Sequence, residues 1–314
     1  MGAIPRERFA NRVVIITGAS SGFGLAAAEA LHREGASVVM AARNPERLER
    51  AATGLPAQRG REPLWFPCDV SNRPEVDALV AKTVARFGHI DILINNAGSG
   101  LIAPVGAIPL EDARALFETN FFGALNCTQA VLPYLKNQRH GHIVNMSSVA
   151  GLRGIPNSSM YSASKAALIA LSDALRLEVK PFGISVTTIC PSRTNDTPFV
   201  ERAKKYGPIQ LYKVPDSLTT PMVVRALLHA ILHRRRTVIL PFYARAMHAL
   251  NKLSPRVVDH ILYKGMPRIS AQPADRDLAE TPQRARSGGL ARIRRSAEQR
   301  EADKAPSNRD EIKK

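Results

Sequence analysis

The stretch Thr17-Gly18-Ala19-Ser20-Ser21-Gly22-Phe23-Gly24 decides the fold, because it joins an apolar run to a segment of helical spacing near the start of the chain. The run Val13 to Thr17 predicts a strand, and Phe23 to Glu34 predicts a helix. Glycines at such a junction let the backbone approach a phosphate group at the helix N-terminus. A tight loop that binds nothing can have the same composition, but the position after the first strand favours a dinucleotide site. Its predicted residues are Gly18, Ser20, Ser21, Gly22, Phe23 and Gly24.

Apolar runs and helical segments alternate along the first 240 residues, which is typical of parallel strands joined by helices. Seven apolar runs are predicted strands: Val13 to Thr17, Ala36 to Ala42, Pro63 to Cys68, Asp91 to Asn95, His142 to Ser147, Ile184 to Cys190 and Thr237 to Leu240. Six segments are predicted helices: Phe23 to Glu34, Pro45 to Ala52, Pro74 to Phe87, Leu110 to Lys136, Met160 to Lys180 and Pro221 to His233. Because strands this apolar are buried on both faces, we expect helices on both sides of the sheet.

The chain changes character after Leu240. Apolar residues recur at helical spacing from Phe242 to Leu262 with basic residues between them, and Pro255 should divide this stretch into two short helices. From about Ser270 onward large apolar residues become rare, which is typical of disorder. We therefore expect a sheet domain over residues 1–240, a basic amphipathic extension over residues 241–268 and a disordered, non-catalytic tail over residues 269–314.

Charge is distributed unevenly along the 314 residues, whose formal net charge is +17. Residues 193–268 contain 14 Lys and Arg against 4 Asp and Glu, whereas residues 1–192 contain 19 against 15. The basic excess is therefore local. It suggests one face that meets phosphate groups, an acidic surface or anionic lipid.

The sequence contains no predicted membrane span, secretory signal or metal site. No apolar run approaches the roughly 18 residues that a spanning helix needs, and an apolar leader does not precede the first strand. Cys68, Cys127 and Cys190 lie far apart without histidine partners at metal-ligand spacing. These features predict a protein of a reducing compartment, the cytoplasm, that holds no metal.

The end of the second predicted strand indicates which dinucleotide would bind. A ribose 2′-hydroxyl needs an acidic acceptor there, but the strand ends in Ala41 and Ala42 and is followed by Arg43. An arginine at this place suits a 2′-phosphate, although a solvated arginine at a strand end is common. The sequence therefore predicts NADP(H) in preference to NAD(H).

Tyr161 and Lys165 stand four residues apart near the start of a predicted helix, so their side chains share one face. Such a pair arises often by chance and carries little weight alone. Its significance comes from Ser148 at the end of the fifth predicted strand, from Asn120 within the longest predicted helix, and from the glycine-rich turn.

With these motifs the chain resembles the classical short-chain dehydrogenase/reductase family from about Arg12 to Leu240. Six motifs stand in the family's order: Thr17 to Gly24, Asp69-Val70, Asn95 to Gly98, Glu118 to Asn120, Ser147 to Gly151 and Tyr161 to Lys165. The resemblance implies a single doubly wound Rossmann-type α/β domain with a seven-stranded parallel sheet and NAD(P)(H) across the carboxyl ends of its strands. It also implies cofactor contacts beyond the glycine-rich turn, from Asp69, Val70, Asn96, Ala97, Gly98, Tyr161, Lys165, Pro191 and Thr194.

The resemblance implies that Tyr161 is the acid/base, with Ser148, Asn120 and Lys165 beside it. Hydride addition to a ketone or aldehyde leaves an alkoxide, which needs a proton donor and a hydrogen bond on the same oxygen. Tyr161 can supply the proton and Ser148 the hydrogen bond. A free phenol has a pKa of about 10, and we expect the Lys165 ammonium and a cationic nicotinamide to lower it. Asn120 is expected to open its helix for a water that links Lys165 to solvent, although a structural amide is the commoner role.

One segment departs from the family pattern. After the sixth strand the family usually has Pro-Gly, with Thr five residues after the Pro, whereas this chain has Ser192 and Asp196 at those two places. Contacts to the nicotinamide amide are therefore open: either Thr197 takes over after a local shift, or this side of the site is looser.

The segment after the sixth strand should determine the substrate. Aromatic and aliphatic residues there are expected to line a pocket for a lipophilic carbonyl compound: Phe199, Tyr206, Ile209, Leu211 and Tyr212. Nearby cations are expected to face anionic lipid headgroups: Arg234, Arg235, Arg236, Arg245, Lys252 and Arg256. The alternative is that the apolar stripe of residues 242–262 packs on the domain's own core and the cations form a solvated face.

The sequence as a whole predicts an NADP(H)-dependent carbonyl reductase or alcohol dehydrogenase that acts on a lipophilic ketone, aldehyde or secondary alcohol. It identifies neither the substrate nor the direction of the reaction. The resemblance implies a homodimer or homotetramer that pairs through the two long helices. Two alternatives stay open. One is an NADP(H)-binding sensor or scaffold without turnover. The other is nucleic-acid binding by the basic region, which lacks the interleaved aromatic residues that recognition needs and is not expected.

Overall fold

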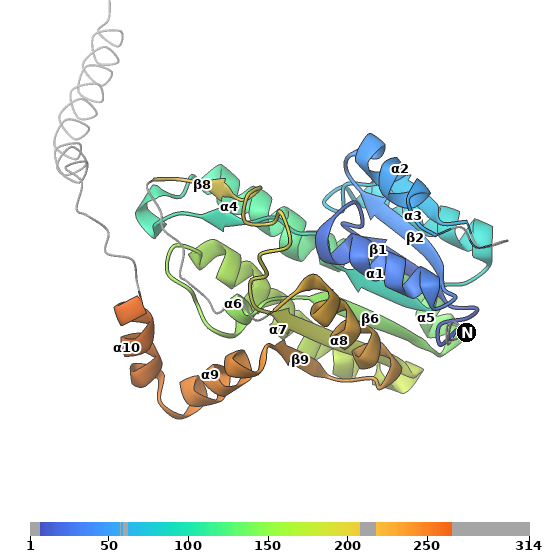
Figure 1. The fold of residues 1–314 in the computed structure, drawn as a ribbon. Helices are drawn as coiled ribbons and strands as arrows, with labels where there is room; N and C mark the ends of the chain where they lie inside the picture. The colour runs from blue at the N-terminus through green and yellow to red at the C-terminus, as the bar shows by residue number, and fades with distance from the viewer. Residues whose placement is uncertain (1–6, 57, 59–61, 208–217, 266–314) are drawn as a thin grey trace, which may run out of the picture. The chain divides into compact units, whose positions relative to one another are not determined.

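The computed structural model describes residues 7–56, 58, 62–207 and 218–265, and a sheet of seven parallel strands forms its centre (Figure 1). The strand order is β3, β2, β1, β4, β6, β7 and β9. Their bounds are β1 Val13–Thr17, β2 Ser37–Ala42, β3 Leu64–Pro67, β4 Ile92–Asn95, β6 Gly141–Met146, β7 Ile184–Pro191 and β9 Thr237–Leu240. All seven predicted strands are confirmed, and the parallel α/β fold class with them.

Helices cover both faces of the sheet, as the apolar strands predicted (Figure 1). Val14 and Ile16 of β1 belong to one core, with α1 Gly22–Arg33, α2 Pro45–Thr53 and α8 Thr220–Leu232. Val13 and Ile15 belong to the other, with α3 Arg73–Phe87, α5 Gly123–Gln138 and α7 Ser159–Glu178. The alternation of side chains along each strand produces this division.

All seven strands are parallel, so the residues that follow their carboxyl ends gather at one edge of the sheet. β1 lies between β2 and β4, so the direction of strand addition reverses there: the chain runs from β1 outward to β2 and β3 and then crosses back to β4 on the other side of β1. Ligands of open α/β sheets bind outside the strand ends at such a switch point. The glycine-rich turn follows β1 at this place.

Two short strands form a second parallel pair that the sequence did not predict: β5 Leu101–Ile102 and β8 Lys204–Lys205. β5 follows β4, and β8 lies in the long segment after β7. Two residues are too few for an alternating pattern to be detected. The pair joins these two segments at the carboxyl edge of the sheet.

The longest predicted helix is a composite in the structure. α4 Leu110–Phe117 continues into a π-helical turn, Glu118–Phe122, and then into α5. A π turn widens the helix by one residue and often marks a functional site. Asn120 lies inside this turn and is 1% exposed.

Two helices follow β9: α9 Phe242–Leu253 and α10 Pro255–Gly265, so the predicted break before Pro255 is confirmed. They extend past the end of β9 on the side of α6 Val149–Leu152 (Figure 1). Their buried residues are Ala244 and Val258, whereas Phe242 is 79% exposed and Leu253 is 85% exposed. The predicted stripe does not form part of either core cluster, which disagrees with the alternative that it packs on the domain's own core.

The predicted basic face is divided in the structure. Arg234, Arg235 and Arg236 precede β9 and lie at the amino edge of the sheet, while Arg245 and the later cations follow β9. Arg236 forms an ion pair with Asp173 of α7 at 3.1 Å. The two groups of cations therefore lie at opposite ends of β9, and their contact with lipid stays a prediction.

The tail from Ser270 onward and the end of the extension, residues 266–268, lie outside the described residues. Of α9 and α10, neither approaches the length of a bilayer span, and no helix within the described ranges is both long and apolar enough to cross one.

Candidate active site

The glycine-rich turn is shaped to expose backbone. Gly18 and Gly22 have φ values of 66° and 55°, which side chains disfavour. A Cβ on Gly24 would lie 2.4 Å from the carbonyl oxygen of Gly18, so only glycine fits there. The Ala19 N–H donates to the Ala41 carbonyl at 3.1 Å and ties the turn to the end of β2. This side-chain-free surface beside the N-terminus of α1 fits a pyrophosphate group.

The other predicted residues of the turn are only partly accessible to a ligand. Ser20 and Ser21 are half-buried, and Ser21 is the N-cap residue of α1. The Phe23 side chain packs against the core that contains α1 and α8. Any contact of Phe23 with a cofactor would therefore come from its backbone.

Asn96, which follows β4, and Thr17, the last residue of β1, hold the turn in place by hydrogen bonds. The Asn96 side-chain amide donates to the Thr17 carbonyl at 2.9 Å and to the Gly18 carbonyl at 3.3 Å. The Thr17 hydroxyl accepts from the backbone N–H groups of Asn96 and Ala97, each at 3.0 Å. The Asn96 side-chain amide is thus occupied in shaping the turn, and its contact with the adenosine half stays a prediction.

The residues predicted for the adenosine half follow β2 and β3. Arg43 is exposed directly after β2, beside the strand that carries the glycine-rich turn. The Asp69 carboxylate accepts from the Ser71 N–H at 3.0 Å and from the Ser71 hydroxyl at 2.7 Å. Val70 is buried, and its carbonyl accepts from the Asn126 amide at 3.0 Å. The three predicted residues share one edge, with Arg43 offering a free charge to solvent.

The Tyr161–Lys165 pair lies in the first turns of α7, as predicted. Lys165 is 4% exposed, and its ammonium donates to the Met146 carbonyl at the end of β6 at 2.8 Å. The ammonium lies 5.9 Å from the centre of the Tyr161 ring. A hydrogen bond at the end of β6 therefore fixes the buried Lys165 ammonium beside the phenol.

Asn120 is held by the segment after β4. Its Oδ1 accepts from the Ser99 N–H at 2.8 Å, and its Nδ2 donates to the Ser99 carbonyl at 3.0 Å and to the Ser164 hydroxyl at 3.1 Å. A Cβ on Gly98 would lie 3.2 Å from Asn120 Oδ1 and 3.5 Å from Lys165 Nζ. A Cβ at Gly98 would therefore crowd Asn120 and touch Lys165, which places Gly98 between the two side chains.

Ser148 follows β6 and caps the short helix α6, a helix that the sequence did not predict. Its hydroxyl accepts from the Ala150 N–H at 3.2 Å and donates to the Pro191 carbonyl at 3.3 Å. It also lies close enough to the Tyr161 phenol to lower the pKa of that group. The four predicted catalytic residues thus converge from the end of β6, the start of α7 and the π turn.

Burial shifts the pKa values of Tyr161 and Lys165 so that the neutral form of each side chain is favoured. It raises the pKa of Tyr161 to about 12, against a smaller lowering by the Ser148 hydroxyl. It lowers the pKa of Lys165 to about 8. The predicted lowering of the phenol pKa is therefore not present in the protein alone. A neutral phenol is the form that can donate a proton.

The departure after β7 has a structural explanation. The Asp196 carboxylate accepts from the Thr220 N–H at 2.7 Å and from the Thr220 hydroxyl at 3.0 Å, so it caps α8. The hydroxyls of Thr194 and Thr197 lie 3.4 Å apart. The Thr197 methyl lies 3.7 Å from the place of a Cβ on Gly22, which brings Thr197 against the glycine-rich turn.

Aromatic residues of this segment take different places. The ring of Phe199 lies 5.6 Å from the ring of Tyr161, and its role in a substrate pocket stays a prediction. The Tyr206 hydroxyl instead bonds to the carboxylate of Asp112. Ile209, Leu211 and Tyr212 lie outside the described residues.

Two contacts of the site were missed by the sequence analysis. The Arg202 guanidinium donates to the Ser21 hydroxyl at 3.0 Å, and the Tyr243 hydroxyl lies 3.1 Å from the Ser192 hydroxyl. The excess of cations in residues 193–268 was the only signal for Arg202. Tyr243 explains why a serine is accommodated in the glycine place, because its hydroxyl pairs with that of Ser192.

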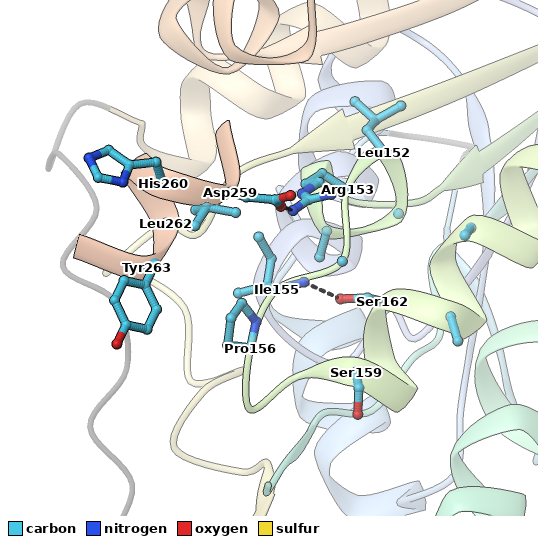
Figure 2. A pocket seen from close by; sticks show the side chains of 15 residues that line it. Leu152, Arg153, Ile155, Pro156, Ser159, Ser162, Asp259, His260, Leu262 and Tyr263 are labelled. Carbon is cyan, nitrogen blue, oxygen red and sulfur yellow. Dashed lines mark hydrogen bonds and ion pairs between the residues drawn. The ribbon is translucent and has the colours of Figure 1, made fainter. Parts of the chain in front are cut away.

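A cavity of about 960 Å³ lies between the α6 segment, the start of α7 and α10 (Figure 2), and it is lined by chain neighbours of Ser148 and Tyr161, not by these two residues themselves. Ala150 and Gly151 in its wall follow Ser148 in the chain, and Ser162 follows Tyr161. Arg153 and Asp259 form an ion pair that joins the loop after α6 to α10 across this cavity. Most of the remaining lining is apolar: Leu152, Ile155, Pro156, Ala163, Ala166, Leu262 and Tyr263.

Cys68, Cys127 and Cys190 are unpaired and buried. Burial raises the pKa of Cys68 and Cys190 to about 12. Within the described parts of the chain, no three His, Cys, Asp or Glu side chains gather closely enough to hold a metal ion.

Comparison with known proteins places this geometry in a family. Residues 12–206 match the model of the short chain dehydrogenase family. The chain is 32% identical over 257 residues to the ketoacyl reductase HetN of a Nostoc species, which spans 80% of this chain and 88% of that protein.

Two solved structures share the fold. One is a short chain dehydrogenase/reductase from Burkholderia phymatum in complex with NAD, with 28% identity, a TM-score of 0.71, and coverage of 79% of this chain and 95% of that one. The other is an alcohol dehydrogenase from Thermococcus sibiricus complexed with 5-hydroxy-NADP, with 27% identity, a TM-score of 0.64, and coverage of 73% and 95%.

Proposed function

The chain belongs to the short chain dehydrogenase family and is an oxidoreductase, and we propose that it reduces a ketone or aldehyde to an alcohol with NADPH. The observation that carries this proposal is the convergence of Tyr161, Ser148, Lys165 and Asn120 at the strand ends beside the glycine-rich turn. The reduced nicotinamide, when bound, supplies the hydride. The chain's own residues supply the proton and hold the oxygen that receives it.

Tyr161 donates its phenolic proton to the substrate oxygen as charge develops there, and Ser148 donates a hydrogen bond to the same oxygen. The reaction leaves Tyr161 as a phenolate, which the nearby Lys165 ammonium stabilises. Asn120 keeps the segment after β4 in place around Gly98, where a water between Asn120 and Lys165 would return a proton to the site. The raised pKa of Tyr161 favours reduction, because the phenol begins in its protonated form.

NADP(H) is preferred over NAD(H) in this proposal because of Arg43. Its guanidinium is exposed at the carboxyl end of β2, where a ribose 2′-phosphate would lie, and no acidic residue precedes it. The comparisons include both an NAD complex and a 5-hydroxy-NADP complex, so the choice rests on this residue.

A lipophilic substrate is supported by the cavity between the α6 segment and α10. Leu262→Trp would fill part of it from α10. We expect this variant to lower kcat/KM for long-chain carbonyl compounds about tenfold and to spare short ones, in line with about 1–3 kcal/mol for a changed apolar contact. An equal effect on short and long substrates would mean that the cavity does not bind the apolar part of the substrate.

A homodimer is proposed from exposed apolar residues on the two long helices. Leu177 on α7 is 70% exposed and Tyr134 on α5 is 37% exposed, on helices that cover the same face of the sheet. Leu177→Glu should shift sedimentation toward the monomer.

The free cysteines support a reducing compartment such as the cytoplasm.

The exposed apolar residues of α9 and α10, beside Arg245, Lys252 and Arg256, support contact with an anionic membrane surface.

The experiment that tests the function is a panel of ketones and aldehydes of increasing apolar size, with NADPH oxidation followed by absorbance. Oxidation that depends on the carbonyl compound is expected, faster with NADPH than with NADH. Tight NADPH binding without turnover on any member of the panel would favour a sensor or scaffold.

A further inference from the structure

The segment after β7 reaches back to the glycine-rich turn, and we propose that Arg202 on this segment binds the pyrophosphate of the cofactor. The proposal rests on the proposed NADP(H) function and adds a cation from a distant part of the chain. Arg202 Nη1 donates to Ser21 Oγ at 3.0 Å, although 181 residues separate the two in sequence. Ser21 belongs to the turn whose bare backbone fits a pyrophosphate.

The position of Arg202 is fixed by its neighbours on both sides. Before it, Asp196 is bonded to Thr220 of α8. After it, the Lys204 N–H donates to the Gly100 carbonyl at 3.1 Å, and β8 pairs with β5. Buried Ala203 packs so closely on Gly100 that a Cβ there would lie 2.8 Å from that of Ala203. The guanidinium is thus held near the turn by a segment tied at two points.

The electrostatics of this place are incomplete without an anion. The first amides of α1 have no intrahelical acceptor, the Ser21 side chain does not cap them, and no acidic residue lies in the first turn of α1. The N-terminus of a helix favours negative charge. At the N-terminus of α1, however, the charged side chain that bonds to Ser21 is the cation Arg202. No carboxylate among the described residues forms an ion pair with Arg202. A phosphate group would satisfy both the amides and the guanidinium.

Two arginines would then recognise different phosphates of one cofactor. Arg43 follows β2 and is proposed to meet the 2′-phosphate, which only NADP(H) carries. Arg202 lies at the turn between β1 and α1, where the pyrophosphate common to NADP(H) and NAD(H) is expected. The two residues therefore predict opposite patterns of cofactor discrimination.

The test is a set of fluorescence titrations at fixed ionic strength on the full chain, with NADPH, NADH and ADP-ribose, plus 2′-AMP as a ligand without a pyrophosphate. Arg202→Ala should weaken NADPH, NADH and ADP-ribose by a similar factor of about 10, as for a partly exposed charge-assisted contact, and leave 2′-AMP unchanged. Arg202→Lys should retain most of the affinity. Arg43→Ala should weaken NADPH and 2′-AMP selectively.

Lys205→Ala is the matched control, because it removes an exposed cation three residues from Arg202 on the same segment. It should bind all four ligands as the wild type does. The melting curves of Arg202→Ala and Lys205→Ala should match that of the wild type, since both side chains are exposed.

Wild-type affinity of Arg202→Ala for all four ligands would overturn the proposal while leaving the proposed function intact. Tighter binding by Arg202→Ala would also overturn it, because Arg202 would then compete with the cofactor for Ser21. A wild-type chain that binds neither NADPH nor NADH would overturn the proposed function and this inference together.

Discussion

The residues around Tyr161 and the residues after β7 differ in how the fold holds them. Asn120, Ser148 and Lys165 are at most 8% exposed, and backbone or buried side-chain partners fix each of them at the strand ends. The α9–α10 extension instead leaves Phe242 and Leu253 about four-fifths exposed and meets the rest of the chain through contacts such as Tyr243 with Ser192.

This difference separates chemistry from choice of substrate. Reacting groups must keep sub-ångström geometry, which a buried hydrogen-bonded network at the end of a sheet provides. A substrate-binding segment needs only shape and charge, and loops on a rigid scaffold provide these while tolerating variation. Changes in the first region should therefore affect the reaction itself, and changes in the second should affect which molecules or surfaces are bound.

The largest effect is expected for Tyr161→Phe. The ring keeps its packing against Phe199, but the proton donor is lost, so kcat for carbonyl reduction should fall by about 100-fold or more. NADPH affinity should stay within about twofold of the wild type. Near-normal turnover in this variant would contradict the assignment of proton donation to Tyr161.

The next effect is a dependence of reduction on pH. Burial lowers the pKa of Lys165 to about 8, so its ammonium is present below pH 8 and is lost as the pH rises above it. Since the ammonium stabilises the phenolate that reduction leaves, kcat/KM should be level below pH 8 and fall about tenfold per pH unit above it. Lys165→Arg, which keeps its charge, should move the fall to higher pH. A rate that stays level to pH 10 would remove Lys165 from the reaction.

A smaller effect is expected at the adenosine end. Arg43→Ala combined with Ala42→Asp exchanges a partner for the 2′-phosphate for a partner of the ribose hydroxyl. The ratio of kcat/KM for NADPH to that for NADH should fall by about tenfold or more, with kcat at saturating cofactor nearly unchanged. An unchanged ratio would mean that Arg43 is a solvated surface residue.

The smallest effect concerns the extension. Leu253→Glu places a charge on the exposed face of α9 at no folding cost, and it should reduce co-sedimentation with vesicles that contain anionic lipid several-fold. Val105→Glu, at another highly exposed apolar position, is the control and should leave sedimentation unchanged. Equal sedimentation of all three proteins would exclude the extension from a membrane-binding role.

The seven strands could be predicted from the sequence because each is a short apolar run buried on both faces. The alignment of Tyr161 with Lys165 follows from helical spacing, and Ser148 from its place at a strand end. The π turn at Asn120 could not be predicted from periodicity, since one inserted residue barely alters the apolar pattern. The pKa of Tyr161 depends on burial, which spacing alone does not reveal.

The substrate side was harder to predict because long-range pairing decides it. Asp196 bonds to Thr220, Tyr206 to Asp112 and Arg202 to Ser21, and no local sequence pattern predicts such partners. The six cations grouped by sequence were divided by β9, because a parallel strand carries the chain from one edge of the sheet to the other.

Transfer of deuterium from NADPH labelled at nicotinamide C4 tests the central claim most directly. The two C4-deuterated forms of NADPH are incubated separately with the wild type and a carbonyl compound that it turns over, and the product is analysed by mass spectrometry. Hydride transfer to a carbonyl predicts that one of the two forms labels the carbinol carbon of the alcohol, and that Tyr161→Phe lowers the yield of labelled alcohol about 100-fold. If NADPH binds but neither form labels an alcohol from any carbonyl compound in the panel, the chain is not a carbonyl reductase.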